Sequence, residues 1–362
     1  MVSAAAVPRA PSGSGFLVSA RFDITWFFAS MAISYGMMAI YLVAGPGPQK
    51  SVVVGLYLAF QLLFNMPHNA QTWTLTVLEP AELAAHRARY LGSLVVTLVL
   101  LGGTMAASPA VGWPLLNSAV IYWGYWHLIK QHFGFVRMYE MRRGVRDRVD
   151  QALSRAALYA GGLAPLVHRI AHGPVMLDAG RGRPMEIAHP ELPSWVATGA
   201  WVVAGTLVGV YVLRQLQQRA RGNAVAPLAV ATLLCAVANF VVAMALVDDL
   251  IVSVAIMTTW HDLQYLGLVW FMSRNRAAWQ QGGRHLVKLA GQGRWRAYAG
   301  WLALYAVVIL GFRVVLPDPW GAFPITLVVA LHYFHDSFIW KIGSNPHLRE
   351  ELGLAPPRTS PA

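Results

Sequence analysis

Apolar runs of roughly 20 residues recur along almost the whole chain, and they constrain its fold more than any other feature of the sequence. A helix needs about 20 apolar residues to cross the hydrocarbon core of a bilayer. The runs leave no room for a separate soluble domain, and only 12% of the residues are charged. The sequence therefore predicts an all-α fold, a polytopic helical bundle embedded in a membrane.

The hydropathy pattern predicts about ten transmembrane helices. Their expected ranges are residues 24–44, 52–78, 90–107, 113–140, 151–170, 194–216, 226–247, 250–272, 297–315 and 322–342. We expect a single transmembrane domain over residues 16–348, a disordered N-terminus over residues 1–15 and a flexible tail over residues 349–362.

The loops between the predicted helices differ in their content of Lys and Arg. Basic residues gather in alternate loops, for example in segments 137–155 and 274–296, whereas the other loops hold few. Because cytoplasmic loops carry the excess of Lys and Arg, we expect both termini on the cytoplasmic side. High usage of Arg, Ala and Gly, without a eukaryotic targeting signal, favours a bacterial inner membrane. This topology explains the net charge of +12, so no nucleic-acid partner is predicted.

Six histidines lie within these apolar runs, and the predicted topology places them at a similar depth. They are His68, His127, His132, His261, His332 and His335. Ionisable side chains within membrane spans are expensive to bury and mark functional sites. Imidazole is also the commonest protein ligand for transition metals. With Cys235 as the one cysteine, a cysteine-ligated cluster is excluded. The pattern predicts a single buried metal site.

Helical spacing indicates which of these groups act together. His332 and His335 are three residues apart, and His332 and Asp336 are four apart, so they can share one helix face. His127 and His132 are five residues apart, which in an ideal helix separates their directions by about 140°. The latter two rings can therefore point to different places.

Carboxylates and polar neighbours complete the predicted site. Asp262, which follows His261, and Asp336 are each expected as a ligand, a supporting group or the partner of a histidine. The expected metal ligands are the six histidines and Asp336, and the expected catalytic residues are His261, His332, Asp262 and Asp336. Side chains expected to orient the imidazoles are Asn65, Thr72, Gln131, Gln264 and Tyr265.

Two of these segments resemble motifs of known metalloenzymes. His127-Leu-Ile-Lys-Gln-His132 resembles the first histidine box, H-x-x-x-x-H, of membrane fatty-acid desaturases and hydroxylases. His332-Tyr-Phe-His335-Asp336 is similar to their H-x-x-H-H boxes, with Asp in the last position, although this chain has no His-His pair. The many spans with a few histidines on separate helices also resemble Brp/Blh-type carotene-cleaving oxygenases. The resemblance implies non-haem iron, as one or two ions, with dioxygen as co-substrate.

These observations predict a membrane-embedded, His-ligated metal oxidoreductase of the oxygenase, desaturase or hydroxylase type. We expect an apolar substrate, such as a lipid, a fatty acyl chain, an isoprenoid or a carotenoid. The basic segment 274–296 is a candidate docking surface for a ferredoxin-like electron donor. Three alternatives stay open: a haem-binding electron carrier, a proton- or ion-coupled transporter that uses the buried His and Asp, and a metal-free acyltransferase.

Overall fold

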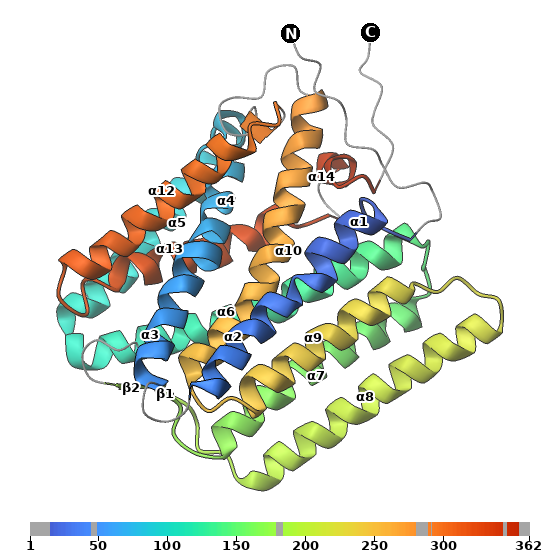
Figure 1. Ribbon diagram of the computed structural model, residues 1–362, viewed down its shortest axis with the longest axis horizontal. Helices are drawn as coiled ribbons and strands as arrows, with labels where there is room; N and C mark the ends of the chain where they lie inside the picture. Colours follow the sequence, from blue (N-terminus) through green and yellow to red (C-terminus); the bar gives the residue numbers. More distant parts are fainter. Residues whose placement is uncertain are drawn as a thin grey trace. The chain divides into compact units, whose positions relative to one another are not determined.

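The computed structural model of the chain describes residues 15–44, 49–178, 184–279, 289–290, 292–342 and 346–354 (Figure 1). These residues are mostly helical, which confirms the predicted all-α class. Within the described ranges the only strands are β1 (Met176–Leu177) and β2 (Met185–Glu186), which form a short antiparallel pair. Residues 1–14 of the predicted disordered N-terminus, residues 355–362 of the predicted tail, and residues 280–288 and 291 of the predicted docking segment lie outside the described part.

Six helical stretches are long and apolar enough to cross a bilayer, which indicates a membrane protein. They are Ala20–Val43, Lys50–Leu75, Pro80–Ala107, Ser194–Ala220, Pro227–Ala245 and Trp295–Val315. Large apolar side chains on these helices are exposed, for example Val43 at 86% and Val99 at 65%, as expected for surfaces that face lipid.

The other four predicted spans are also helical. They lie in α6 (Pro109–Arg142), α7 (Arg148–Ala171), α10 (Leu250–Trp279) and α13 (Phe323–Ile339). Helix α13 is shorter, at 17 residues, and the other three contain charged side chains along their length. The count of about ten spans and the cytoplasmic side of both termini stay predictions.

The chain divides into two compact units, each of which is described by itself. Unit 1 contains Tyr57–Gly124 and the described residues of Asp262–Ala362. It comprises η2 (Gln61–Asn65), α4 (Met66–Leu75), α5 (Pro80–Ala107), α12 (Trp295–Val315), α13, α14 (Pro346–Glu351) and parts of α3 (Gln49–Phe60), α6 and α10. Unit 2 contains the described residues of Arg9–Leu56 and Tyr125–His261. It comprises α1 (Ala20–Asp23), η1 (Ile24–Ala29), α2 (Met31–Val43), α7, α8 (Ser194–Ala220), α9 (Pro227–Ala245), both strands and the remaining parts of α3, α6 and α10.

In unit 1, α4 packs against α12 and α13 (Figure 1). Buried apolar side chains from these helices, among them Met66, form a common core. The turn before α4 is π-helical: the Met66 N–H donates to the Gln61 carbonyl rather than to the residue four before it. Pro67, which follows, has no N–H to donate. Such wide turns are frequent at functional sites, and this one directly precedes His68.

The C-terminal helix α14 is fixed to α10 by a two-point ion pair. Arg276 donates to both carboxylate oxygens of Glu351, at 2.7 and 2.9 Å. The Asn275 side chain also donates to the Glu351 carbonyl at 2.7 Å. Residues 346–351 of the chain, which include the start of the predicted tail, are therefore an ordered helix of unit 1.

In unit 2, α7 packs against both α8 and α9. Its first turn is capped by Asp147, whose side chain accepts from the Val149 N–H, and Arg214 of α8 bridges Asp147 and Asp150. Farther along α7, glycine allows close approach of α9. A Cβ atom on Gly161 would lie 2.6 Å from a methyl carbon of Val237. Small residues at helix contacts allow such close packing in membrane proteins.

We therefore expect Gly161→Ala to destabilise unit 2, because the added methyl group overlaps Val237 and overpacking costs about 1–3 kcal/mol. The measurement is thermal unfolding of the purified protein in detergent, where the midpoint should fall by several degrees. Gly199→Ala on α8 is the matched control, since its Cβ would meet no atom within 4 Å. An unchanged midpoint in Gly161→Ala would contradict the close helix contact.

Candidate metal centre

The buried histidines fall into two groups, one in each unit. Unit 1 holds His68 on α4 and His332 and His335 on α13, each at most 2% exposed. Unit 2 holds the other three, which are His127, His132 and His261. That all six bind one ion stays a prediction. Buried His and Asp groups of this chain have the spacing needed to hold a metal ion.

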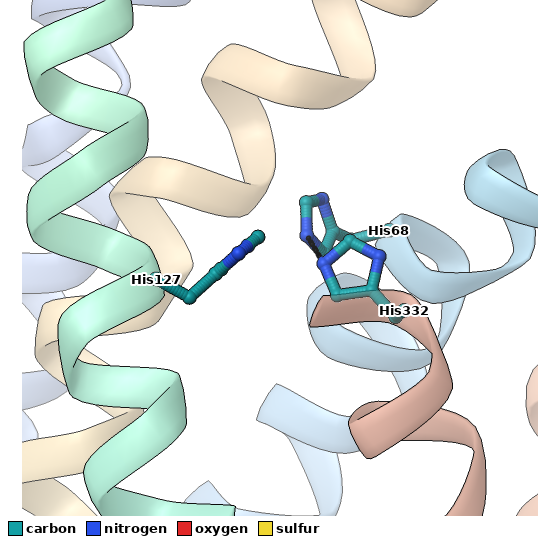
Figure 2. A group of neighbouring side chains, drawn as sticks. All are labelled: His68, His127 and His332. Carbon is teal, nitrogen blue, oxygen red and sulfur yellow. Dashed lines mark hydrogen bonds between the residues drawn. The ribbon is translucent and has the colours of Figure 1, made fainter. Parts of the chain in front are cut away.

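The central feature of unit 1 is a pair of imidazoles that face each other. The Nε2 atoms of His68 and His332 are 2.8 Å apart, and Figure 2 shows the two rings edge to face. Two nitrogens that bind one ion at about 2.1 Å and at a right angle are about 3.0 Å apart. The pair is therefore spaced either for a direct hydrogen bond or for two ligands of one metal ion.

Hydrogen bonds on the far side of the His332 ring determine which nitrogen carries its proton. The Thr72 hydroxyl donates to Asp336 Oδ1 at 2.9 Å, so its oxygen accepts from the Nδ1–H of His332 at 2.7 Å. Tyr265 also donates to Asp336 Oδ1, at 3.1 Å. In the neutral ring, Nε2 of His332 then carries the lone pair that binds a metal. This is the arrangement by which outer hydrogen bonds orient metal-ligating histidines.

Asp262 of α10 supplies a carboxylate beside the same pair. Its Oδ1 atom is 3.9 Å from Nδ1 of His68, and the residue is fully buried. Among the described residues, neither carboxylate oxygen of Asp262 has a hydrogen-bond partner. A buried carboxylate without donors is costly unless a cation or a proton compensates it. His332 lies at Nε2 of His68 and Asp262 at Nδ1, so the two histidines are spaced to share one ion and the carboxylate can balance the charge of a nearby cation.

His335 lies against a different set of neighbours from His332. Its Nε2 atom is 3.0 Å from the Ser93 hydroxyl on α5, and its ring packs edge-on against Tyr90 and Trp73. Its Nδ1 atom has no hydrogen-bond partner in the described part of the chain. Spacing alone groups His335 with His332, but on α13 it is Asp336 that shares the hydrogen-bond network of His332.

In unit 2, both α6 histidines lie near the ring of His261. The ring centroids of His127 and His132 are 5.8 and 5.5 Å from that of His261, despite the divergence expected from their spacing. The Nδ1–H of His132 donates to the Leu128 carbonyl at 2.9 Å, so Nε2 carries the lone pair. Within the described ranges this Nε2 has no hydrogen-bond partner. The side chain also packs on Trp260, at 4.8 Å between ring centroids.

The residues predicted to support the imidazoles have different surroundings. Tyr265 packs edge-on against the His68 ring at 4.2 Å and donates to Asp336, so it belongs to the unit 1 network. Asn65 donates to the Gln61 side chain and accepts from Asn69, both on its own helical stretch. Gln264 is fully buried in unit 1, and Gln131 is half-buried in unit 2.

One hydroxyl residue of unit 1, Ser93, was absent from the predicted site. Thr72 was expected to support an imidazole from its spacing of four residues from His68, and it joins His332 to Asp336. Ser93 contacts His335 from an apolar helix with many exposed side chains, and nothing in its local sequence points to that contact.

Comparison of the chain with protein-family models, curated proteins and solved structures finds no match.

We expect Thr72→Val to weaken metal binding about 10- to 100-fold, because His332 loses the acceptor that fixes its Nδ1 proton. The measurement is metal retained by the purified protein during dialysis against increasing chelator concentrations. Thr72→Ser, which keeps the hydroxyl, should retain the metal. Thr74→Val is a matched control on the same helix, since the Thr74 hydroxyl donates to the Gln71 carbonyl. Equal retention in Thr72→Val and the unaltered protein would contradict this role.

Proposed function

We propose that the protein is a membrane-embedded metalloenzyme that oxidises an apolar substrate with dioxygen. The observation that supports this most directly is the pair of Nε2 atoms of His68 and His332, 2.8 Å apart in a buried interior. Histidine ligands together with a carboxylate are typical of non-haem ferrous oxygenases, and here the Asp262 carboxylate lies 3.9 Å from Nδ1 of His68. Such an ion, when bound, supplies open coordination positions at which dioxygen is activated.

The neighbouring side chains would orient the histidine ligands and keep water out of the centre. Asp336 keeps the Nδ1 proton of His332 in place through Thr72, while Tyr265 donates to the same carboxylate. The Tyr265 ring also covers one side of His68. Burial of all these groups excludes water, which strengthens the electrostatic interactions inside the site.

The apolar surroundings favour an apolar substrate. Six helices have the length and composition of membrane spans, so a lipid, acyl chain, isoprenoid or carotenoid would reach the protein through the bilayer. Cleavage, hydroxylation and desaturation are all compatible with the proposed centre. A ferredoxin-like electron donor remains part of the proposal, with the basic segment 274–296 as its docking surface.

The geometry of unit 1 favours this proposal over a haem carrier. Two axial histidines lie on opposite sides of a haem iron, with their nitrogens about 4 Å apart. The Nε2 atoms of His68 and His332 are closer than this, at 2.8 Å. Their separation suits neighbouring positions on one small ion.

We expect the purified protein to contain near-stoichiometric iron without a Soret band. His68→Gln and His332→Gln should each lower the iron content to background, because each removes one ligand, and Asp262→Asn should lower it in part, because the buried negative charge beside His68 is lost. The measurement is elemental analysis together with an absorption spectrum of protein purified in detergent.

His335→Gln is the matched control, since it removes a buried histidine that bonds to Ser93 and should leave the iron in place. A symmetric elution profile in gel filtration shows that each variant is folded. A Soret band would replace the proposal with the haem carrier. Absence of metal in the unaltered protein would contradict both the oxygenase and the haem carrier. The histidine pair would then be a simple hydrogen bond, and the transporter and acyltransferase interpretations would remain.

A further inference from the structure

A cavity of about 530 Å³ in unit 1 lies outside the histidine pair. This volume is in the usual range for small-ligand pockets. Its lining comes from the ends of α4, α10 and α13, the start of α5, and α14. Leu75, Met272 and Ile339 contribute apolar surface, while Arg89 and Lys341 contribute positive charge.

The two cations are held at one aromatic ring. The Arg89 guanidinium carbon is 4.6 Å from the centroid of the Phe338 ring, and Lys341 Nζ is 4.8 Å from the same centroid. Arg89 is half-buried and Lys341 exposed, so both charges border the cavity while staying accessible. No carboxylate within the described residues forms an ion pair with Arg89.

Two further charged groups of the lining, Arg276 and Glu82, are engaged within unit 1. Arg276 is neutralised by the two-point contact with Glu351. Glu82 accepts from the Tyr90 hydroxyl at 2.6 Å and lies 3.8 Å from Nε2 of His86. The cavity therefore presents two cations, beside apolar walls, against one hydrogen-bonded carboxylate.

We propose that this cavity binds the anionic head group of an amphiphile, a carboxylate or a phosphate, with Arg89 and Lys341 as its cationic ligands. Basic pockets between membrane helices bind lipid head groups in this way, and guanidinium suits both anions because it donates two parallel hydrogen bonds. The apolar side chains of the same cavity suit the start of a hydrocarbon tail.

Two aromatic residues connect this cavity to the buried histidines. Trp340 lines the cavity and packs against Tyr265 at 5.3 Å, and Tyr265 contacts His68. Tyr90 also lines the cavity and packs against His335 at 5.0 Å. That the bound amphiphile is the substrate rests on the proposed function; its binding does not require the metal.

The test is equilibrium binding of radiolabelled oleate to the full-length protein in a neutral detergent. Arg89→Gln/Lys341→Gln should weaken binding at least about tenfold, which corresponds to about 1.4 kcal/mol. Lys341→Arg, which keeps the charge, should bind like the unaltered protein. The matched control is Arg87→Gln/Arg296→Gln, which removes two exposed positive charges of unit 1 outside the cavity and should leave affinity unchanged.

Competition experiments identify the ligand class. Dodecyl phosphate should displace oleate, whereas oleyl alcohol, which lacks the charge, should not. Displacement by inorganic phosphate at equal concentration would support the anion site and assign it to a free anion rather than a lipid. Equal oleate affinity in both double variants, or displacement by oleyl alcohol as strong as by dodecyl phosphate, would overturn the proposal.

Iron content measured on the same samples separates this inference from the proposed function. Loss of oleate binding with iron retained in Arg89→Gln/Lys341→Gln supports the head-group site alone. Normal oleate binding in protein that contains no iron would contradict the oxygenase proposal and leave the head-group site intact.

Discussion

The hydrogen bonds that Asp336 accepts hold the polar interior of unit 1 together. Thr72 and Tyr265 both donate to its Oδ1 atom, and Thr72 in turn accepts from His332. Burying an unpaired carboxylate or imidazole in an apolar interior costs several kcal/mol, so each of these groups depends on the others. The result is a ring whose Nε2 atom is aimed at His68 with a defined protonation state.

The two buried carboxylates of unit 1, Asp336 and Asp262, differ in their hydrogen-bond donors. Asp336 has two hydroxyl donors, whereas Asp262 has no hydrogen-bond partner among the described residues. Both side chains are buried on helices of the same unit. A satisfied carboxylate stabilises its neighbours, while an unsatisfied one beside an imidazole is suited to a cation.

The spans and the buried histidines could be predicted because both are properties of local sequence. Each predicted span coincides with helix, since apolar composition and helical length are encoded within one segment. Their number as membrane spans stays a prediction, because the polar side chains of α6 and α10 reduce the apolar character of these two helices. Partners such as Ser93, and the separate roles of His335 and Asp336, depend on contacts between segments far apart in the sequence.

The sequence by itself determined that this is an all-α chain with membrane-like helices and that histidines and carboxylates are buried within them. Hydropathy and helical spacing are short-range properties, so composition and periodicity suffice to establish them. Only the tertiary structure decided that His68 meets His332 and that Arg89 and Lys341 share the ring of Phe338. It also decided that Asp336 accepts from Thr72 and Tyr265, whereas Asp262 has no donor among the described residues. These facts depend on how α4, α5, α10 and α13 pack in unit 1, because helix packing rather than spacing brings distant side chains to one point.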